Sequence, residues 1–196
     1  MNMSLVGAIW EKGHAERPAA GFARHYITLY SLVFGMEAKR VFEFGVGFST
    51  QTIKEALRQT GGHLTSVDYQ AQENYNHEDP LWTFYEGKSG QVVPTIIHAP
   101  YDLVLHDGSH LRDEVCEDLN NILPYIKKGG LLLIHDTNHS RKGISLMGAM
   151  LGGIEDSNLK NYKHEILTLP YSCGLTMVKF LTSDTDEEVQ INWSPK

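Results

Sequence analysis

The chain has 196 residues, of which 41% are hydrophobic, 21% charged and 10% aromatic. This composition is typical of a folded protein and excludes disorder as the main state, and the length favours one domain with at most a short extension. The 17 basic and 24 acidic residues leave a net charge of −7, and no basic run is longer than the pair at 127–128. The charge therefore argues against nucleic acid as the main partner.

No stretch is typical of a secretion signal or a membrane span. The apolar residues 5–10 are followed at once by Glu11 and Lys12, whereas a signal needs about 7–15 apolar residues and a span ~18. The cysteines, Cys116 and Cys173, lie far apart and outside any C-x-x-C pair, which argues against a disulfide framework and a thiolate zinc site. We therefore expect a cytoplasmic protein without a membrane partner.

Hydrophobic periodicity in the first half of the chain alternates between helical and strand-like spacing. It predicts a helix over residues 18–37 that begins at Pro18, and strands at 40–44, 64–67 and 82–85. Between the first two strands it predicts a helix capped by Ser49 or Thr50 and ended by Gly61–Gly62. The polar stretch 69–80 predicts a loop or a short helix.

The second half continues the alternation. It predicts strands at 103–106, 131–134, 165–169 and 175–181, with helices at 111–122 and around 147–154. Gly129–Gly130 predicts a turn into the strand at 131–134, and the short loop between the last two strands favours an antiparallel pair. The order predicts an α/β fold with a Rossmann-like, doubly wound, mostly parallel seven-stranded sheet and a C-terminal antiparallel hairpin.

A glycine-containing loop follows the first strand, in the segment VFEFGVGFST at 41–50. A dinucleotide-binding fingerprint would have a third glycine where Thr50 stands and would usually lack an acid at the position of Glu43. Asp68 ends the second strand 21 residues after Gly47, where an acid can accept hydrogen bonds from both ribose hydroxyls. The loop therefore favours a nucleoside ligand and disfavours a pyrophosphate.

On these residues the chain, from about 40 to 180, resembles the class I methyltransferases that use S-adenosylmethionine. In that family the E-x-G-x-G loop wraps the amino-acid end and ribose of the cofactor, and the acid after the second strand holds the ribose. The segment 86–89 resembles the stretch beside the adenine, with Lys88 where an acid is common. The resemblance implies a cofactor site made of Glu43, Gly45, Val46, Gly47, Ser49, Thr50, Asp68, Tyr69, Gly87, Lys88, Asp107 and Gly108.

Polar residues are dense after the fourth and fifth strands, in LHDGSH at 105–110 and IHDTNH at 134–139. These strand ends are neighbours in a parallel sheet, so Asp107 and Asp136 are expected to converge and could hold one divalent cation. Their oxygen atoms suit magnesium, and an added imidazole suits manganese or iron.

The D-G-S-H motif with the later polar pair resembles metal-dependent sugar O-methyltransferases of macrolide pathways and cephalosporin-hydroxylase-like proteins. The nearest resemblance is to a branch that carries D-G-x-H and H-D-T. It implies metal ligands at Asp107, His135 and Asp136, with His135 where the former proteins have Glu, and magnesium or manganese as the metal. It also implies a catalytic set of Asp107, His110 and Asp136, with His110 as the base and His139 as the competing candidate.

The sequence thus predicts an S-adenosylmethionine-dependent methyltransferase that acts on a small molecule, most simply at a hydroxyl oxygen, by in-line displacement. By the same resemblance, residues 1–39 form a helical cap or lid and residues 40–196 the cofactor-binding domain. One alternative is an NAD-binding oxidoreductase, which Thr50 disfavours. Another is a non-catalytic cofactor-binding partner protein, which His135 favours and His110 disfavours. The acceptor has no recognisable pattern, and the first helix could also cover a second copy in a homo-oligomer.

Overall fold

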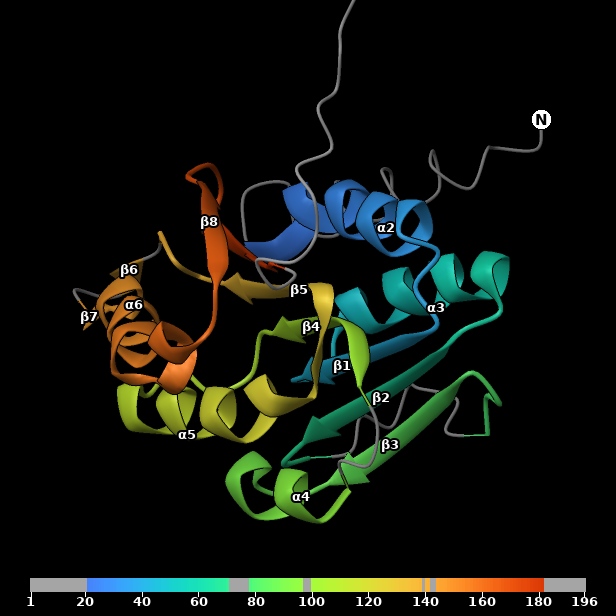
Figure 1. The fold of residues 1–196 in the computed structure, drawn as a ribbon, viewed down its shortest axis with the longest axis horizontal. Coiled ribbons are helices and arrows are strands. Elements are labelled where there is room, and N and C mark those ends of the chain that lie inside the picture. Colours follow the sequence, from blue (N-terminus) through green and yellow to red (C-terminus); the bar gives the residue numbers. More distant parts are fainter. Residues whose placement is uncertain (1–20, 71–77, 97–99, 139, 142–143, 182–196) are drawn as a thin grey trace, which may run out of the picture.

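The computed structural model describes residues 21–70, 78–96, 100–138, 140–141 and 144–181. Its centre is a seven-stranded sheet (Figure 1). In spatial order the strands are β3 (Trp82–Glu86), β2 (His63–Asp68), β1 (Arg40–Phe44), β4 (Tyr101–His106), β5 (Ile126–His135), β9 (Leu175–Phe180) and β8 (His164–Leu169). The first five are parallel, and β9 runs antiparallel to both of its neighbours. The predicted fold, with its C-terminal hairpin, is confirmed.

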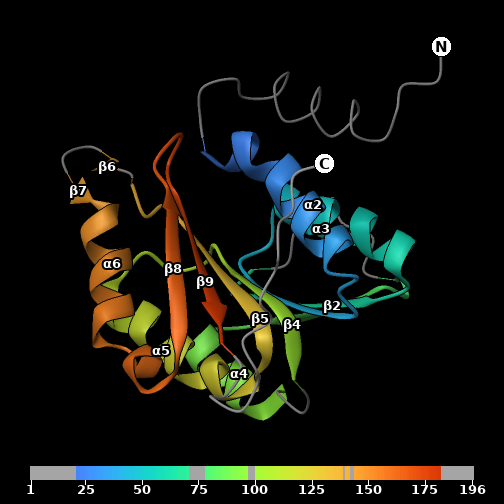
Figure 2. The same ribbon diagram turned by 45° about the horizontal axis from the view of Figure 1, so that its top comes forward.

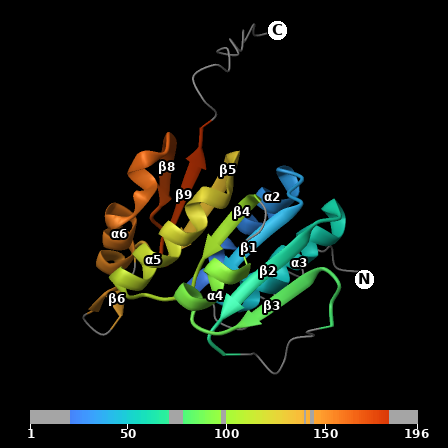
Figure 3. The same ribbon diagram turned by 60° about the horizontal axis from the view of Figure 1, so that its bottom comes forward.

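Helices cover both faces of the sheet. On one face lie α2 (Tyr26–Gly35) and α3 (Phe48–Thr60); on the other lie α4 (Ser89–Ile96), α5 (Arg112–Ile122) and α6 (Leu146–Asp156) (Figures 2 and 3). The shorter elements are 3-10 turns at Gly21–His25, Leu123–Tyr125 and Asn158–Asn161, and a small ladder of β6 (Ser140–Arg141) and β7 (Ile144–Ser145). No helix among the described residues is long and apolar enough to cross a bilayer.

Alternate side chains of each central strand enter opposite cores because successive residues of a strand point to opposite faces. On β5, Leu132 and Ile134 join Val115 and Leu119 of α5 in one core, whereas Leu133 joins the core beneath α2 and α3. The uniformly apolar run of this strand is explained by burial on both faces.

Three local predictions differ from the structure. The described part of the first helix begins as a 3-10 turn at Gly21–His25, and its expected start at Pro18 lies outside the described residues. The N-cap of α3 is Gly47 rather than Ser49 or Thr50, because the Thr50 hydroxyl lies within the first turn and accepts a hydrogen bond from the Gly47 N–H at 3.1 Å. The predicted turn at Gly129–Gly130 is wrong: β5 runs through both residues with a register shift against β4.

Candidate cofactor and catalytic site

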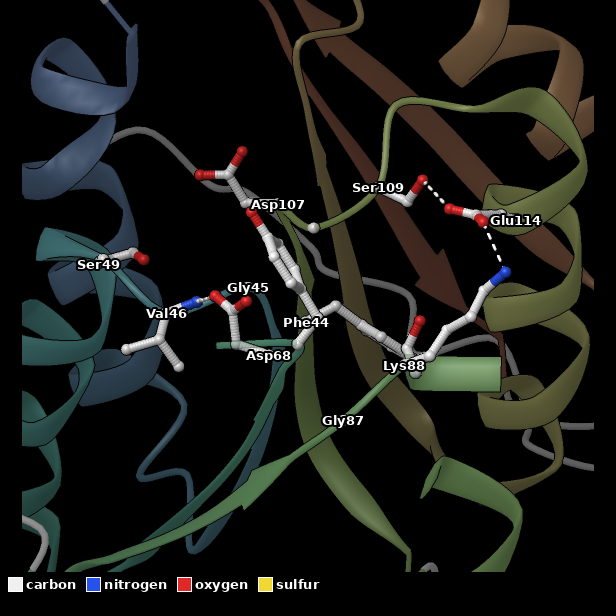
Figure 4. A pocket seen from close by; sticks show the side chains of 14 residues that line it. Phe44, Gly45, Val46, Ser49, Asp68, Gly87, Lys88, Asp107, Ser109 and Glu114 are labelled. Carbon is white, nitrogen blue, oxygen red and sulfur yellow. Dashed lines mark hydrogen bonds and ion pairs between the residues drawn. The ribbon is translucent and has the colours of Figure 1, made fainter. Parts of the chain in front are cut away.

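A cavity of about 470 Å³ opens at the carboxyl ends of β1, β2 and β4 (Figure 4). This place is a topological switch point, because the chain leaves β1 toward one sheet edge and later returns to β4 on its other side. The cavity is lined by Phe44, Gly45, Val46, Gly47, Ser49, Asp68, Tyr69, Gly87, Lys88, Ser89, Asp107, Gly108, Ser109 and Glu114. Every residue expected to bind the cofactor is therefore part of the lining except Glu43 and Thr50.

The glycine loop is held by backbone contacts from two neighbouring strands. Gly45 has φ +83°, and a Cβ there would lie 2.3 Å from the carbonyl oxygen of Asp107, so only glycine fits. The Val46 N–H donates to the Asp68 carboxylate at 2.8 Å. The loop and the expected ribose-binding acid are thus fixed relative to each other, on one side of the cavity (Figure 4).

Glu43 lies beneath the loop, fully buried. Its carboxylate accepts hydrogen bonds from Ser49 at 2.6 Å, Thr50 at 2.7 Å and Ser66 at 2.9 Å, and Trp82 donates to the Ser66 hydroxyl. Burial raises the pKa of Glu43 to about 7, although the three hydroxyl donors oppose this rise. This network ties the first turn of α3 to β1 and β2, so Glu43 and Thr50 shape the loop from below.

The opposite side of the cavity carries an ion pair that sequence reasoning missed. Lys88 Nζ lies 2.7 Å from Glu114 Oε1, and the Ser109 hydroxyl donates to Glu114 Oε2 at 2.5 Å (Figure 4). The hydrogen bond from Lys88 holds the pKa of Glu114 below its usual value. Glu114, in the first turn of α5, reaches across to the loop after β3.

The polar groups after β4 and β5 converge, as adjacent parallel strands require. His110 Nε2 lies 2.6 Å from Asp136 Oδ2, and His135 Nδ1 lies 3.0 Å from Asp107 Oδ1 and 3.4 Å from Asp136 Oδ1. Asp136 adopts φ +58°, a region that non-glycine residues seldom occupy and that is common at functional sites. Two imidazole–carboxylate pairs therefore stand side by side.

The charges of these groups depend on one another. Burial alone would raise the pKa of Asp136, but the hydrogen bond from His110 and the charges of both imidazoles hold it below its usual value. Burial alone would lower the pKa of His135, but the charge of Asp107 and its hydrogen bond raise it. Asp136 is therefore an anion at neutral pH, suited to orienting an imidazole.

Two compact sets of possible metal ligands occur among the described residues. One consists of Asp107, His110 and Asp136, and the other of His135, Asp136 and Cys173; within each set the ligand atoms lie within 4.8 Å of one another. Each set contains two of the three residues expected as metal ligands: Asp107 and Asp136 are in the first set, and His135 and Asp136 are in the second. The sequence could not indicate Cys173 as a neighbour, since it lies in the distant loop between β8 and β9.

The N-terminal segment covers this part of the site. Phe22 packs on His135 with ring centroids 4.5 Å apart, and the fully buried His25 stacks on Tyr171 at 4.9 Å. Burial lowers the pKa of His25 to about 4, so its imidazole is neutral at pH 7. His139, the competing base, lies outside the described residues.

Comparisons with known proteins agree with this geometry. Residues 42–137 match the model of a methyltransferase domain family, and no functionally curated protein matches the sequence. The fold is similar to that of Podospora anserina methyltransferase PaMTH1 bound to SAH (TM-score 0.67, 15% identity, 91% of this chain and 88% of that one). It is also similar to the O-methyltransferase TomG from Streptomyces achromogenes in complex with SAM (0.63, 15%, 93% and 92%).

A third similar structure is the mycinamycin-pathway methyltransferase MycE in complex with Mg, SAH and mycinamycin VI (TM-score 0.65, 16% identity). Its alignment covers 98% of this chain but 58% of that protein. The methyltransferase-domain match over residues 42–137, the sheet order and the switch-point cavity together support a class I, S-adenosylmethionine-dependent methyltransferase. The chain carries the D-G-S-H and H-D-T motifs at the carboxyl ends of β4 and β5.

Proposed function

We propose that the chain methylates a hydroxyl oxygen of a small molecule, with His110 as the general base. The supporting observation is the 2.6 Å pair of His110 Nε2 and Asp136 Oδ2 directly after the cavity-lining segment 107–109. Asp136, as an anion, accepts a hydrogen bond from the Nε2–H group, so the electron pair of the neutral imidazole is on Nδ1. That nitrogen is the atom proposed to take the acceptor's proton.

The cavity walls account for the remaining requirements of the transfer. S-adenosylmethionine supplies an electrophilic methyl carbon, so the protein must chiefly hold the two reactants at about 3–3.5 Å and receive one proton. In this proposal the Asp68 carboxylate, which accepts from the Val46 N–H, holds the ribose hydroxyls, and Lys88 and Glu114 lie at the side that receives the adenine. Asp136 then stabilises the imidazolium that forms on His110.

A hard divalent cation fits the same site and is part of this proposal. Asp107 and Asp136 belong both to the expected ligand set and to a compact set of the structure, and carboxylate oxygens are suitable ligands for Mg²⁺ or Mn²⁺. His135 remains the third candidate ligand from the sequence, and its imidazole lies beside both carboxylates. A bound cation would lower the pKa of the acceptor hydroxyl.

The role of residues 1–39 as a lid is also proposed. Its support is the packing of Phe22 and His25 against His135 and Tyr171. This packing excludes water from one side of the His135 imidazole. The wide separation of Cys116 and Cys173 supports a reducing cytoplasmic location, and the acceptor is expected to be a small molecule rather than a nucleic acid.

His110→Ala tests the base. With radiolabelled S-adenosylmethionine and a panel of phenols, sugars and hydroxy acids, kcat should fall by about 10²–10⁴ because only proton transfer is lost. The affinity for S-adenosylhomocysteine, measured by calorimetry, should stay the same. His63→Ala is the matched control, since His63 pairs with Thr83 at the far end of β2 and should turn over normally. Full turnover by His110→Ala together with an inactive His139→Ala would move the base to the second loop.

A further inference from the structure

Three buried side chains of different chemistry meet behind the His110–Asp136 pair. His135 is the last residue of β5, Asp136 follows it, and Cys173 comes from the loop between β8 and β9. They are 2%, 9% and 7% exposed, and their ligand atoms lie within 4.8 Å of one another. Nitrogen, oxygen and sulfur donor atoms therefore lie close together in a region that is largely buried from solvent.

The position of Cys173 is set by backbone contacts rather than by a flexible side chain. Its carbonyl oxygen accepts the Asn138 N–H at 2.8 Å, and the Thr176 hydroxyl donates to Thr137 at 2.9 Å. Gly174 has φ +84°, and a Cβ there would lie 2.4 Å from the Asn138 nitrogen. These contacts hold the segment after β5 against the loop between β8 and β9. The three donors are therefore arranged before any ligand binds.

The hydrogen bonding of His135 accounts for one of its two ring nitrogens. Asp107 accepts from Nδ1 at 3.0 Å, which places the electron pair of the neutral ring on Nε2. Nε2 is buried and has no hydrogen-bond partner among the described residues. A histidine that binds a metal usually donates its other N–H to a carboxylate in this way.

We propose that His135, Asp136 and Cys173 bind a transition-metal ion of the zinc type, with Asp107 as the hydrogen-bond partner that orients His135. Zinc accepts imidazole, carboxylate and thiolate together and readily leaves a fourth position open, whereas a thiolate disfavours magnesium. The Cys173 thiol hydrogen-bonds to Asp136, so binding releases one thiol proton to solvent as the metal–sulfur bond forms. This site does not depend on the proposed methyl acceptor.

Cobalt(II), a spectroscopic substitute for zinc, tests the proposal on the full-length protein after removal of metals. One equivalent should produce a thiolate-to-cobalt absorption band in the near ultraviolet. Cys173→Ser should abolish the band, and Asp107→Asn should weaken cobalt binding by about 10- to 100-fold because His135 loses its orienting partner. Cys116→Ser is the control for the other thiol and should keep the band. His110→Ala should also keep it, because His110 belongs to the other compact set.

Circular dichroism and S-adenosylhomocysteine binding show whether Cys173→Ser is folded, and Cys173→Ala provides a second variant without a hydroxyl. Absence of the band in the wild-type protein would overturn the metal site, as would an unchanged band in both Cys173 variants. A protein that binds S-adenosylhomocysteine but gives no band refutes this site alone. A protein that gives the band but fails to bind S-adenosylhomocysteine refutes the proposed function alone.

Discussion

At the scale of single residues, the chemistry of the site depends on what surrounds each titratable group. Burial acts on both Glu43 and His25 and favours the neutral form of each. His135 is also buried, yet its pKa rises because Asp107 lies 3.0 Å away. Two buried histidines therefore have pKa values shifted in opposite directions, and the carboxylate beside His135 accounts for the difference.

Glu43→Gln should change the pH dependence of stability. The pKa of Glu43 is raised from 4.5 to about 7 in the folded protein. Its stabilising contribution is therefore complete below pH 4.5 and is lost as the pH rises to 7, by about 3 kcal/mol at most. Glutamine cannot ionise, so the variant should gain stability relative to wild type over this range.

Urea unfolding at several pH values measures this difference. His25 titrates in the opposite sense, because its lowered pKa makes the folded state lose stability as the pH falls below 6.5. The difference between Glu43→Gln and wild type isolates Glu43, since His25 is common to both. Glu86→Gln, at an exposed position at the end of β3, should show no such change. A pH-independent difference for Glu43→Gln would mean that folding does not raise the pKa of Glu43.

At the scale of elements, loops rather than helices and strands decide the shape of the cavity. The turn between β1 and α3 approaches the turn after β4 so closely that the carbonyl of Asp107 occupies the space of a Gly45 side chain.

In α4, Pro94 lies inside a short helix whose first turn lines the cavity. Its eight residues offer too little apolar periodicity to distinguish a helix from a loop in the sequence.

Gly45→Ala should weaken both folding and cofactor binding. The added Cβ meets backbone at 2.3 Å and φ is +83°, so either the loop or the Asp107 turn must move; we expect a loss of about 2–4 kcal/mol in the free energy of unfolding. Gly35→Ala is the control, because a Cβ there meets nothing within 4 Å, and it should be neutral or slightly stabilising. Thermal unfolding with and without S-adenosylhomocysteine measures both effects. Wild-type values for Gly45→Ala would contradict the observed approach of the two turns.

At the scale of the whole molecule, ligand binding at the switch point should stabilise the entire sheet, because loops from β1, β2, β3 and β4 share the cavity. S-adenosylhomocysteine at 100 times its Kd should add about 2.7 kcal/mol. For a chain of this length that corresponds to a rise in Tm of roughly 5–10 °C. NAD at the same concentration should leave Tm unchanged, because the loop lacks the third glycine of a dinucleotide site.

Asp68→Ala should reduce this thermal stabilisation. The variant loses the carboxylate proposed to accept from both ribose hydroxyls, which should weaken S-adenosylhomocysteine binding by about 10- to 150-fold, or about 1.5–3 kcal/mol. Glu165→Ala on the exposed edge strand β8 is the control and should respond like wild type. An equal rise in Tm for Asp68→Ala and wild type would remove Asp68 from the binding site.

Local patterns in the sequence predicted the seven strands and the alternating helices other than α4, and the resemblance carried by the glycine loop indicated the class of protein. Periodicity reports which face of each segment is buried, and a parallel sheet places the D-G-S-H and H-D-T motifs at neighbouring strand ends. The convergence of Asp107 and Asp136 was predictable for the same reason.

Only the tertiary structure decided which side chains meet when they come from distant loops. The pairing of Lys88 with Glu114 and the approach of Cys173 to Asp136 both depend on how the loops pack. Such contacts are set by close backbone approach and by glycines with positive φ, as at Gly45 and Gly174. Neither periodicity nor spacing records these long-range constraints, because each arises from two segments that are not neighbours in the sequence.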